Sequence, residues 1–220
     1  MVADDCTPEA RITKSLLGYG VLAGLFYVLA SVVQGLLRAG FNFTRDSWSL
    51  LSLGPNGWVH VVVFIVTGLM VAAAGVGFRR HGHGLAGAAL ITYGLLLVVA
   101  GLARPDTPGA GFSTHGLVHL GAGGLGFVAF TVAALAMARR LGQQKAPGWT
   151  LWSLVAGLAL LVGFVGVASG STSAPVILGF TAAVVLSWAW LATVSVRLYR
   201  ETSARGRVRT AVDVASPVAP

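Results

Sequence analysis

Three histidines in the chain stand close to aspartates, and their spacing could support metal chemistry. His115 and His119 are four residues apart, so on an α-helix they would share one face. His60 occupies a similar position near the start of an earlier apolar stretch. Three histidines that leave one position for water form a catalytic zinc site, and a nearby carboxylate can act as the base. One hypothesis is therefore a metal-dependent membrane hydrolase with zinc held by His60, His115 and His119.

The aspartates and arginines near these histidines support a second interpretation. Asp46 follows Arg45, and Asp106 stands two residues after Arg104. Polar groups near a membrane are costly when unpaired, so we expect an arginine to pair with an aspartate across the two segments. The histidines lack an H-E-x-x-H motif, and a polar cluster of this kind can instead bind a lipid headgroup or a hydrophobic small molecule. The candidate ligand-binding residues are Arg45, Asp46, Arg104, Asp106, His115 and His119.

The composition places these residues in an integral membrane protein. Of the 220 residues, 55% are hydrophobic and 10% are charged, and the mean hydropathy is +0.80, which excludes a soluble globular protein of this size. The single cysteine, Cys6, excludes an intrachain disulfide and a cysteine-based zinc site. The formal net charge is +8, but the basic residues separate apolar stretches and form no patch. We therefore expect no nucleic-acid partner and no cofactor other than the hypothetical zinc ion.

Six apolar stretches are long enough to cross a bilayer core of about 30 Å, which takes about 20 helical residues. The predicted fold is all-α, with six transmembrane helices and short connections. The predicted spans are 15–37, 57–78, 85–103, 114–138, 148–169 and 175–196. We expect three parts: an N-terminal segment at 1–14, a six-helix membrane domain at 15–198, and a basic, disordered tail at 199–220.

The basic residues indicate the orientation of these spans, because cytoplasmic loops retain lysine and arginine. Three arginines, Arg38, Arg45 and Arg104, fall on one side of the predicted membrane, and twelve basic residues fall on the other. This predicts that both termini are cytoplasmic and that the candidate site faces outward, in a multi-pass protein of the cell membrane whose partners are lipids. The twelve are Arg11, Lys14, Arg79, Arg80, Arg139, Arg140, Lys145, Arg197, Arg200, Arg205, Arg207 and Arg209.

Two further expectations concern the arrangement of the spans. His60 can join His115 and His119 in one patch only if the second and fourth spans are neighbours at their outer ends. A small-molecule transporter is a third functional hypothesis, but no Asp, Glu, Lys, Arg or His stands near the middle of any span. Transporters commonly place such residues there to bind substrate or relay protons.

Several short motifs in these segments resemble those of a known family, the domain of unknown function 998 family of bacterial six-span membrane proteins. The resemblance covers about residues 15–198. The motifs are the Asp-x-x-Ser-Leu-Leu segment from Asp46, Gly57-Trp58, Thr67-Gly68-Leu69, Gly77-Phe78-Arg79-Arg80, Pro105-Asp106, and His115-Gly116-Leu117-Val118-His119.

The resemblance implies six helices with a polar cluster on one face, and the family brings no established activity. His115 and His119 match its pattern. The family usually has glutamine where this chain has His60 and asparagine where it has Val63, so the resemblance does not support a metal site that uses His60.

Overall fold

The computed structural model describes residues 7–107 and 109–215, with side chains described as far as residue 203. Within those ranges all regular secondary structure is helical, and six helices are long and apolar enough to cross a membrane. This confirms the predicted all-α, six-span architecture. The helices are α1 (Pro8–Leu37), α2 (Gly57–Arg80), α3 (Gly84–Leu102), α4 (Thr114–Gln143), α5 (Pro147–Ala168) and α6 (Ala174–Ala215), with a short 3-10 helix, η1 (Trp48–Ser52), between α1 and α2.

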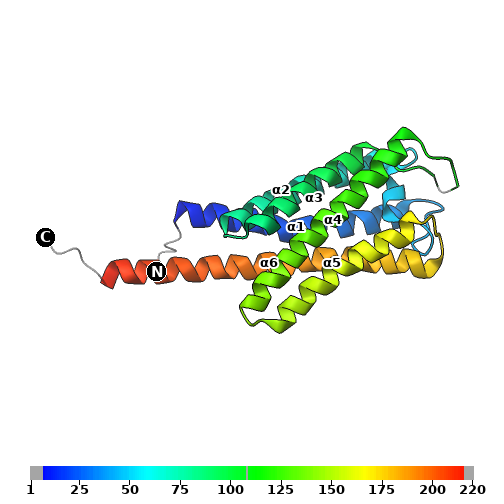
Figure 1. Cartoon of the computed structure of the whole chain (residues 1–220). Coiled ribbons are helices and arrows are strands. Elements are labelled where there is room, and N and C mark those ends of the chain that lie inside the picture. Colours follow the sequence, from blue (N-terminus) through cyan, green and yellow to red (C-terminus); the bar gives the residue numbers. More distant parts are fainter. Residues whose placement is uncertain (1–6, 108, 216–220) are drawn as a thin grey trace.

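The six helices form a closed ring in chain order. Each helix packs against the next, and α6 packs against α1. Figure 1 shows that α1 begins and α6 ends toward the same end of the bundle, which we call the tail end. The connections 38–56, 103–113 and 169–173 lie at the opposite end, which we call the loop end. Because α3 lies between α2 and α4, the second and fourth spans do not pack as direct neighbours along their length, and at the loop end they meet through the rings of Phe64 and His119.

Three helices extend by at least five residues beyond the predicted spans at the tail end. Helix α1 begins at Pro8, where the Thr7 hydroxyl accepts a hydrogen bond from the N–H of Ala10 at 3.3 Å. Helix α4 continues to Gln143, and α6 continues to Ala215. Arginine, alanine and glutamate are good helix formers, so a helix can continue after its apolar stretch ends.

Because of these extensions, parts of both predicted terminal segments are helical. Residues 8–14 are part of α1, and residues 199–215, which were predicted to be disordered, are helical. No proline interrupts the chain between 199 and 215, and the first one after the membrane domain is Pro217. Residues 1–6, including Cys6, and residues 216–220 lie outside the described residues.

Helices α2 and α3 approach each other at paired glycines. A Cβ atom built on Gly94 would lie 2.4 Å from the carbonyl oxygen of Gly68, and one on Gly87 would lie 2.5 Å from that of Gly75. The two pairs are seven residues apart on each helix, so they repeat along one antiparallel seam. A third glycine in the same register, Gly101, faces the Cβ of Phe64. The seam thereby fixes the position of Phe64 at the loop end.

Candidate ligand-binding cavity

A cavity of about 350 Å³ occupies the loop-end half of the bundle. All six helices and all three loop-end connections contribute to its lining. Its volume falls within the range of roughly 300–1,000 Å³ that is typical of small-molecule sites. The ring of helices therefore encloses a space large enough for a ligand.

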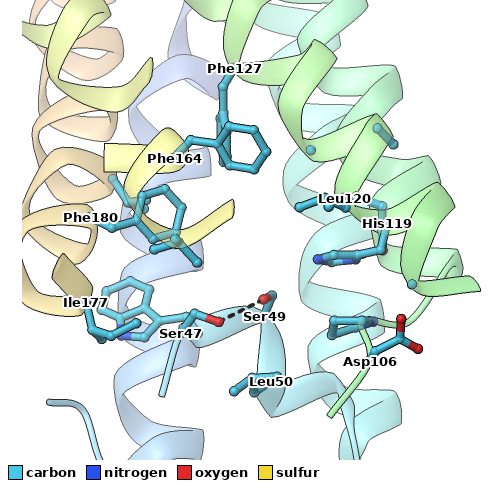
Figure 2. Close-up of a pocket in the computed structure, with 18 of the residues that line it drawn as sticks. Ser47, Ser49, Leu50, Asp106, His119, Leu120, Phe127, Phe164, Ile177 and Phe180 are labelled. Carbon is cyan, nitrogen blue, oxygen red and sulfur yellow. Dashed lines mark hydrogen bonds between the residues drawn. The ribbon is translucent and has the colours of Figure 1, made fainter. Parts of the chain in front are cut away.

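The walls of the cavity are mainly apolar and include several aromatic rings. The rings of Phe127, Phe164 and Phe180, from α4, α5 and α6, form one cluster, with Phe127 5.2 Å from Phe164 and 5.8 Å from Phe180. Figure 2 shows this cluster on one side of the cavity and His119 on the other. Trp188 also lines the cavity and lies about 20 Å along α6 from Ala174, at about 1.5 Å per residue. The apolar walls thus extend well into the membrane-spanning part of the bundle.

Polar side chains border the cavity near the connections. Ser47 and Ser49 come from the first connection, and their hydroxyl oxygens are 3.2 Å apart. Arg45 stands in the same connection, and Ser171 and Thr172 belong to the last one. A molecule in the cavity would therefore meet polar groups at the loop end and aromatic rings farther in.

His119 links α4 to the end of α3. Its Nδ1 lies 2.7 Å from the carbonyl oxygen of Ala100 and 2.9 Å from that of Ala103. Carbonyl oxygens only accept hydrogen bonds, so this nitrogen carries a hydrogen and donates to them. These carbonyls belong to the last turn of α3 and to its C-cap residue, where no helical N–H follows to bind them. His119 therefore provides a hydrogen-bond donor for the carbonyl groups at the end of α3. Its ring also lines the cavity beside Phe64, with the two ring centroids 6.0 Å apart.

Asp106 folds the second of these connections onto the start of α4. Its carboxylate accepts hydrogen bonds from the N–H of Ser113 at 3.0 Å and from the Ser113 hydroxyl at 2.5 Å. The Ser113 hydroxyl in turn accepts from the N–H of Gly116 at 3.0 Å, as the N-cap of α4. The carboxylate occupies the space where a Cβ on residue 116 would lie, so a glycine is required there. The negative charge also suits the N-terminal end of a helix.

The surroundings of Asp106 favour its ionised form. The hydrogen bonds from the hydroxyl and backbone N–H of Ser113 lower the pKa of Asp106 below its ordinary value, and the nearby His115 and His119 act in the same direction. A carboxylate whose pKa is depressed by folding stabilises the folded state above the ordinary value of about 3.9. That contribution is lost as the pH falls through the lower pKa of the folded protein.

We therefore expect the connection at 103–113 to loosen in acid. Below about pH 4, the ordinary range of an aspartate pKa, its backbone amides should exchange hydrogen faster than the intrinsic pH dependence allows. Hydrogen exchange followed by mass spectrometry measures this. In Asp106→Asn, which cannot ionise, the connection should exchange faster at neutral pH and show no such transition. Identical profiles for the variant and the parent protein would show that the carboxylate does not hold this connection.

The structure separates the six candidate residues into two groups. Arg45, Asp106 and His119 line the cavity. Arg104 and His115 are exposed and do not line it, whereas the carboxylate of Asp46 accepts a hydrogen bond from the N–H of Asn42 at 2.7 Å, within its own connection.

The predicted arginine–aspartate pair across the connections is wrong for the residues that the structure describes. The salt bridges found there involve Glu201, with His81 and with Arg197. Asp46 and Asp106 instead accept hydrogen bonds from N–H or O–H groups within their own connections, which are closer along the chain than any arginine of the other connection.

The three histidines of the metal hypothesis do not form one site. Among the described residues, no group of three His, Cys, Asp or Glu side chains could hold a metal ion. His115 is exposed, and His60 is fully buried, with its Nδ1 3.1 Å from the amide oxygen of Gln34. The ring of Phe64 contacts both His60 and His119, with centroid separations of 5.1 and 6.0 Å. The hydrolase hypothesis therefore loses its predicted set of ligands.

Sequence reasoning missed the aromatic lining, which comes from the spans themselves. Tyr27, Tyr93 and Trp188 lie inside the apolar stretches, whereas aromatic residues of membrane proteins are enriched at the two interfaces. Their position away from the interfaces was a usable signal. Each is also an ordinary core residue by type, so the signal alone could not distinguish a packed core from a cavity.

Comparison with known proteins identifies one family. A family model described as "Protein of unknown function (DUF998)" matches residues 21–197, which include parts of all six helices. No curated protein and no solved structure matches the chain.

Proposed function

The chain belongs to the DUF998 family of proteins of unknown function, and from this premise and the cavity we propose that it binds a lipid or another hydrophobic small molecule. The apolar part of that molecule lies against the aromatic walls, and its polar part lies near Arg45, Ser47 and Asp106. The loop end faces the cell exterior, because the tail end carries most of the lysine and arginine. The protein resides in the cell membrane.

The observation that carries this proposal is a ligand-sized cavity inside an otherwise packed bundle. Protein interiors are close-packed and contain few voids larger than a water molecule. An empty space of about 350 Å³ between aromatic walls would forfeit the contacts that neighbouring atoms normally provide. An apolar occupant restores them, and the surrounding lipid supplies such molecules directly.

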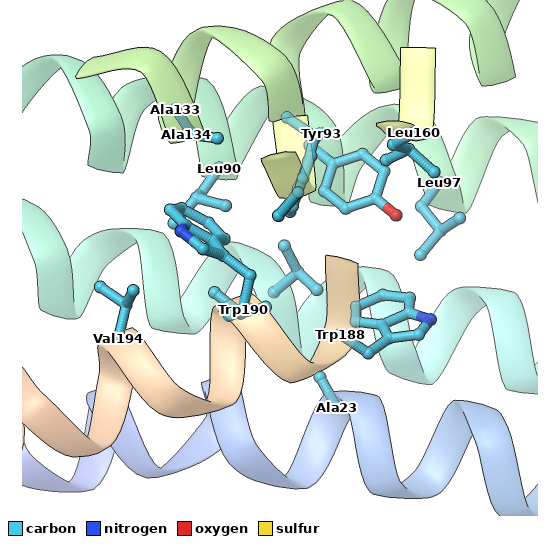
Figure 3. Close-up of a cluster of buried hydrophobic side chains, with 14 of the residues drawn as sticks. Ala23, Leu90, Tyr93, Leu97, Ala133, Ala134, Leu160, Trp188, Trp190 and Val194 are labelled. Carbon is cyan, nitrogen blue, oxygen red and sulfur yellow. The ribbon is translucent and has the colours of Figure 1, made fainter. Parts of the chain in front are cut away.

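The tail-end half of the bundle favours binding over transport. There the rings of Phe130 and Trp190 pack at 5.1 Å, and both side chains are fully buried. Figure 3 shows Trp190 among Leu90, Ala133, Ala134 and Val194. This packed layer lies between the cavity and the tail end, so the cavity is a pocket that ends inside the bundle.

Filling the cavity tests the proposal. A Cβ on Gly123, which lines the cavity, would meet no atom within 4 Å, so Gly123→Leu places its side chain in the space without displacing backbone. Gly121 is the matched control, because it lies two residues away on α4, is exposed, and also meets no atom within 4 Å.

We expect the purified protein and Gly121→Leu to bind methyl oleate saturably in detergent micelles, and to retain apolar molecules that mass spectrometry detects after extraction. Gly123→Leu should bind more than about tenfold less tightly, because the leucine removes apolar surface whose burial stabilises by about 25 cal/mol per Å². The proposal fails if Gly123→Leu binds as tightly as Gly121→Leu, or if none of the proteins binds.

A further inference from the structure

Two indole N–H groups at the cavity have no hydrogen-bond partner among the described residues. Trp48, in η1, and Trp188, in α6, both line the cavity and are 7% and 3% exposed. The Nε1 atom of each is buried and unpaired. An indole N–H can only donate a hydrogen bond, and buried donors are normally satisfied. Each of these two N–H groups therefore lacks the hydrogen-bond acceptor that a buried donor normally has, and no described residue provides one.

Other tryptophans of the same bundle do have partners. Trp190, two residues after Trp188 on α6, donates from Nε1 to the hydroxyl of Ser153 at 2.9 Å. Trp152 donates to the hydroxyl of Thr193 at 3.1 Å. Among these four tryptophans, the two without a partner are the two that line the cavity, which supports an acceptor on its occupant.

The two unpaired indoles share one aromatic neighbour, Tyr27, and Trp188 has a second one, Tyr93. The ring of Tyr27 is 5.9 Å from that of Trp48 and 5.2 Å from that of Trp188, and Tyr93 is 6.1 Å from Trp188. Figure 3 shows the indole nitrogen of Trp188 and the hydroxyl of Tyr93 directed toward the side on which Leu97, another lining residue, lies. Donors and flat apolar rings therefore meet at the inner part of the cavity.

The charges around the cavity favour a neutral acceptor over an anion. Among the described lining residues, Arg45 is the one arginine or lysine, and it stands in the first connection. An anionic oxygen beside Trp188, about 20 Å along α6, would lie in an apolar environment without a basic partner, which is costly. A carbonyl oxygen accepts the same hydrogen bond without carrying that charge.

We propose, building on the function proposed above, that the occupant is an apolar molecule whose carbonyl oxygen accepts a hydrogen bond from the indole N–H of Trp188, with Trp48 donating to a second acceptor. Two classes of membrane-soluble molecule provide this chemistry: the acyl ester of a lipid and the ring carbonyl of a prenylated quinone. Pure hydrocarbons provide the apolar contacts alone.

The test compares three probes on the full-length protein in detergent micelles. The probes are methyl oleate, a menaquinone with a short prenyl chain, and octadecene, which has no oxygen. We expect Trp188→Phe to weaken binding of a carbonyl probe by roughly three- to tenfold, the loss typical of one hydrogen bond, and to leave octadecene binding unchanged. Trp190→Phe is the matched control, because its indole already has a protein partner, and it should change the affinity for none of the probes.

The outcomes separate this inference from the proposed function. If Trp188→Phe loses affinity for methyl oleate alone, the occupant carries an acyl ester. If it loses affinity for menaquinone alone, the occupant is a quinone. If the probes bind but Trp188→Phe affects none of them, the acceptor inference is overturned and the apolar pocket remains. If no probe binds, or Gly123→Leu has no effect, the proposed function itself fails. If Trp188→Phe does not fold, Trp48→Phe in η1 provides the same comparison.

Discussion

Gly94→Ala is expected to lower the free energy of unfolding by about 1–3 kcal/mol or more, the range of an overpacked core. The added Cβ would lie 2.4 Å from the carbonyl oxygen of Gly68 and 2.7 Å from the backbone nitrogen of Ala72. Both contacts are backbone atoms of α2, so no side-chain rotation can relieve them. Helices α2 and α3 must separate, and in a membrane their close approach is a main source of helix association.

Unfolding of the purified protein in mixed detergent micelles measures this effect. Gly18→Ala is the matched control, because a Cβ on Gly18 of α1 would meet no atom within 4 Å, and alanine has a higher helix propensity than glycine. The control should unfold at the same denaturant concentration as the parent protein or at a slightly higher one. Equal stability of Gly94→Ala and Gly18→Ala would contradict the backbone contact at the seam.

The seam also connects the fold to the candidate site. If α2 and α3 separate at Gly94, Phe64 and the carbonyl groups of Ala100 and Ala103 shift relative to His119, because Gly101 holds Phe64 against α3. We therefore expect Gly94→Ala to weaken methyl oleate binding even in the fraction that remains folded.

The number and positions of the spans could be predicted from the sequence because membrane insertion depends on local hydrophobicity. Every predicted span lies within, or within one residue of, a helix of the structure. The helix ends at the tail end could not be found in this way. The apolar stretch shows where a helix leaves the membrane, whereas the end of the helix depends on caps and helix breakers. Thr7 caps α1 beyond its apolar stretch, and no proline stops α6 along residues 199–215.

The α2–α3 seam had a sequence signal that depends on comparing two helices. Gly87, Gly94 and Gly101 are seven residues apart, and so are Gly68 and Gly75. Matching the two series requires knowing that α2 and α3 are antiparallel neighbours, which their short connection at residues 81–83 implies. Glycine is abundant in this chain, with 30 residues, so the seven-residue spacing is harder to distinguish from chance.

The candidate site was predictable only in part, because spacing shows which residues share a helix face and not what covers that face. His115 and His119 share a face of α4, yet one is exposed and the other binds the end of α3. Helix α3 covers this face of α4 only as far as His119, because α3 ends at Leu102. His115 lies one turn farther along α4, where α3 no longer covers it. The cavity itself depends on side chains from six helices, whose relative rotation no single stretch of sequence specifies.

Because only His119 makes these contacts, alanine substitutions of the two histidines should differ strongly in their effect on stability. His119→Ala should lower the free energy of unfolding by about 1–3 kcal/mol, the cost of leaving buried polar groups unpaired. The carbonyl groups of Ala100 and Ala103 lose their donor, and the removed ring leaves empty space beside Phe64. His115→Ala, on the same helix, should change the free energy of unfolding by less than about 0.5 kcal/mol, as expected for an exposed side chain.

Stability and ligand affinity must be compared to assign the role of His119. If His119 mainly ties α4 to α3, His119→Phe, which keeps a ring but removes the N–H, should lose nearly as much stability as His119→Ala. Its folded fraction should bind methyl oleate with nearly the parent affinity, because the aromatic wall remains. If instead both variants keep full stability and lose binding, His119 contacts the occupant directly, and the hydrogen bonds to Ala100 and Ala103 only orient its ring.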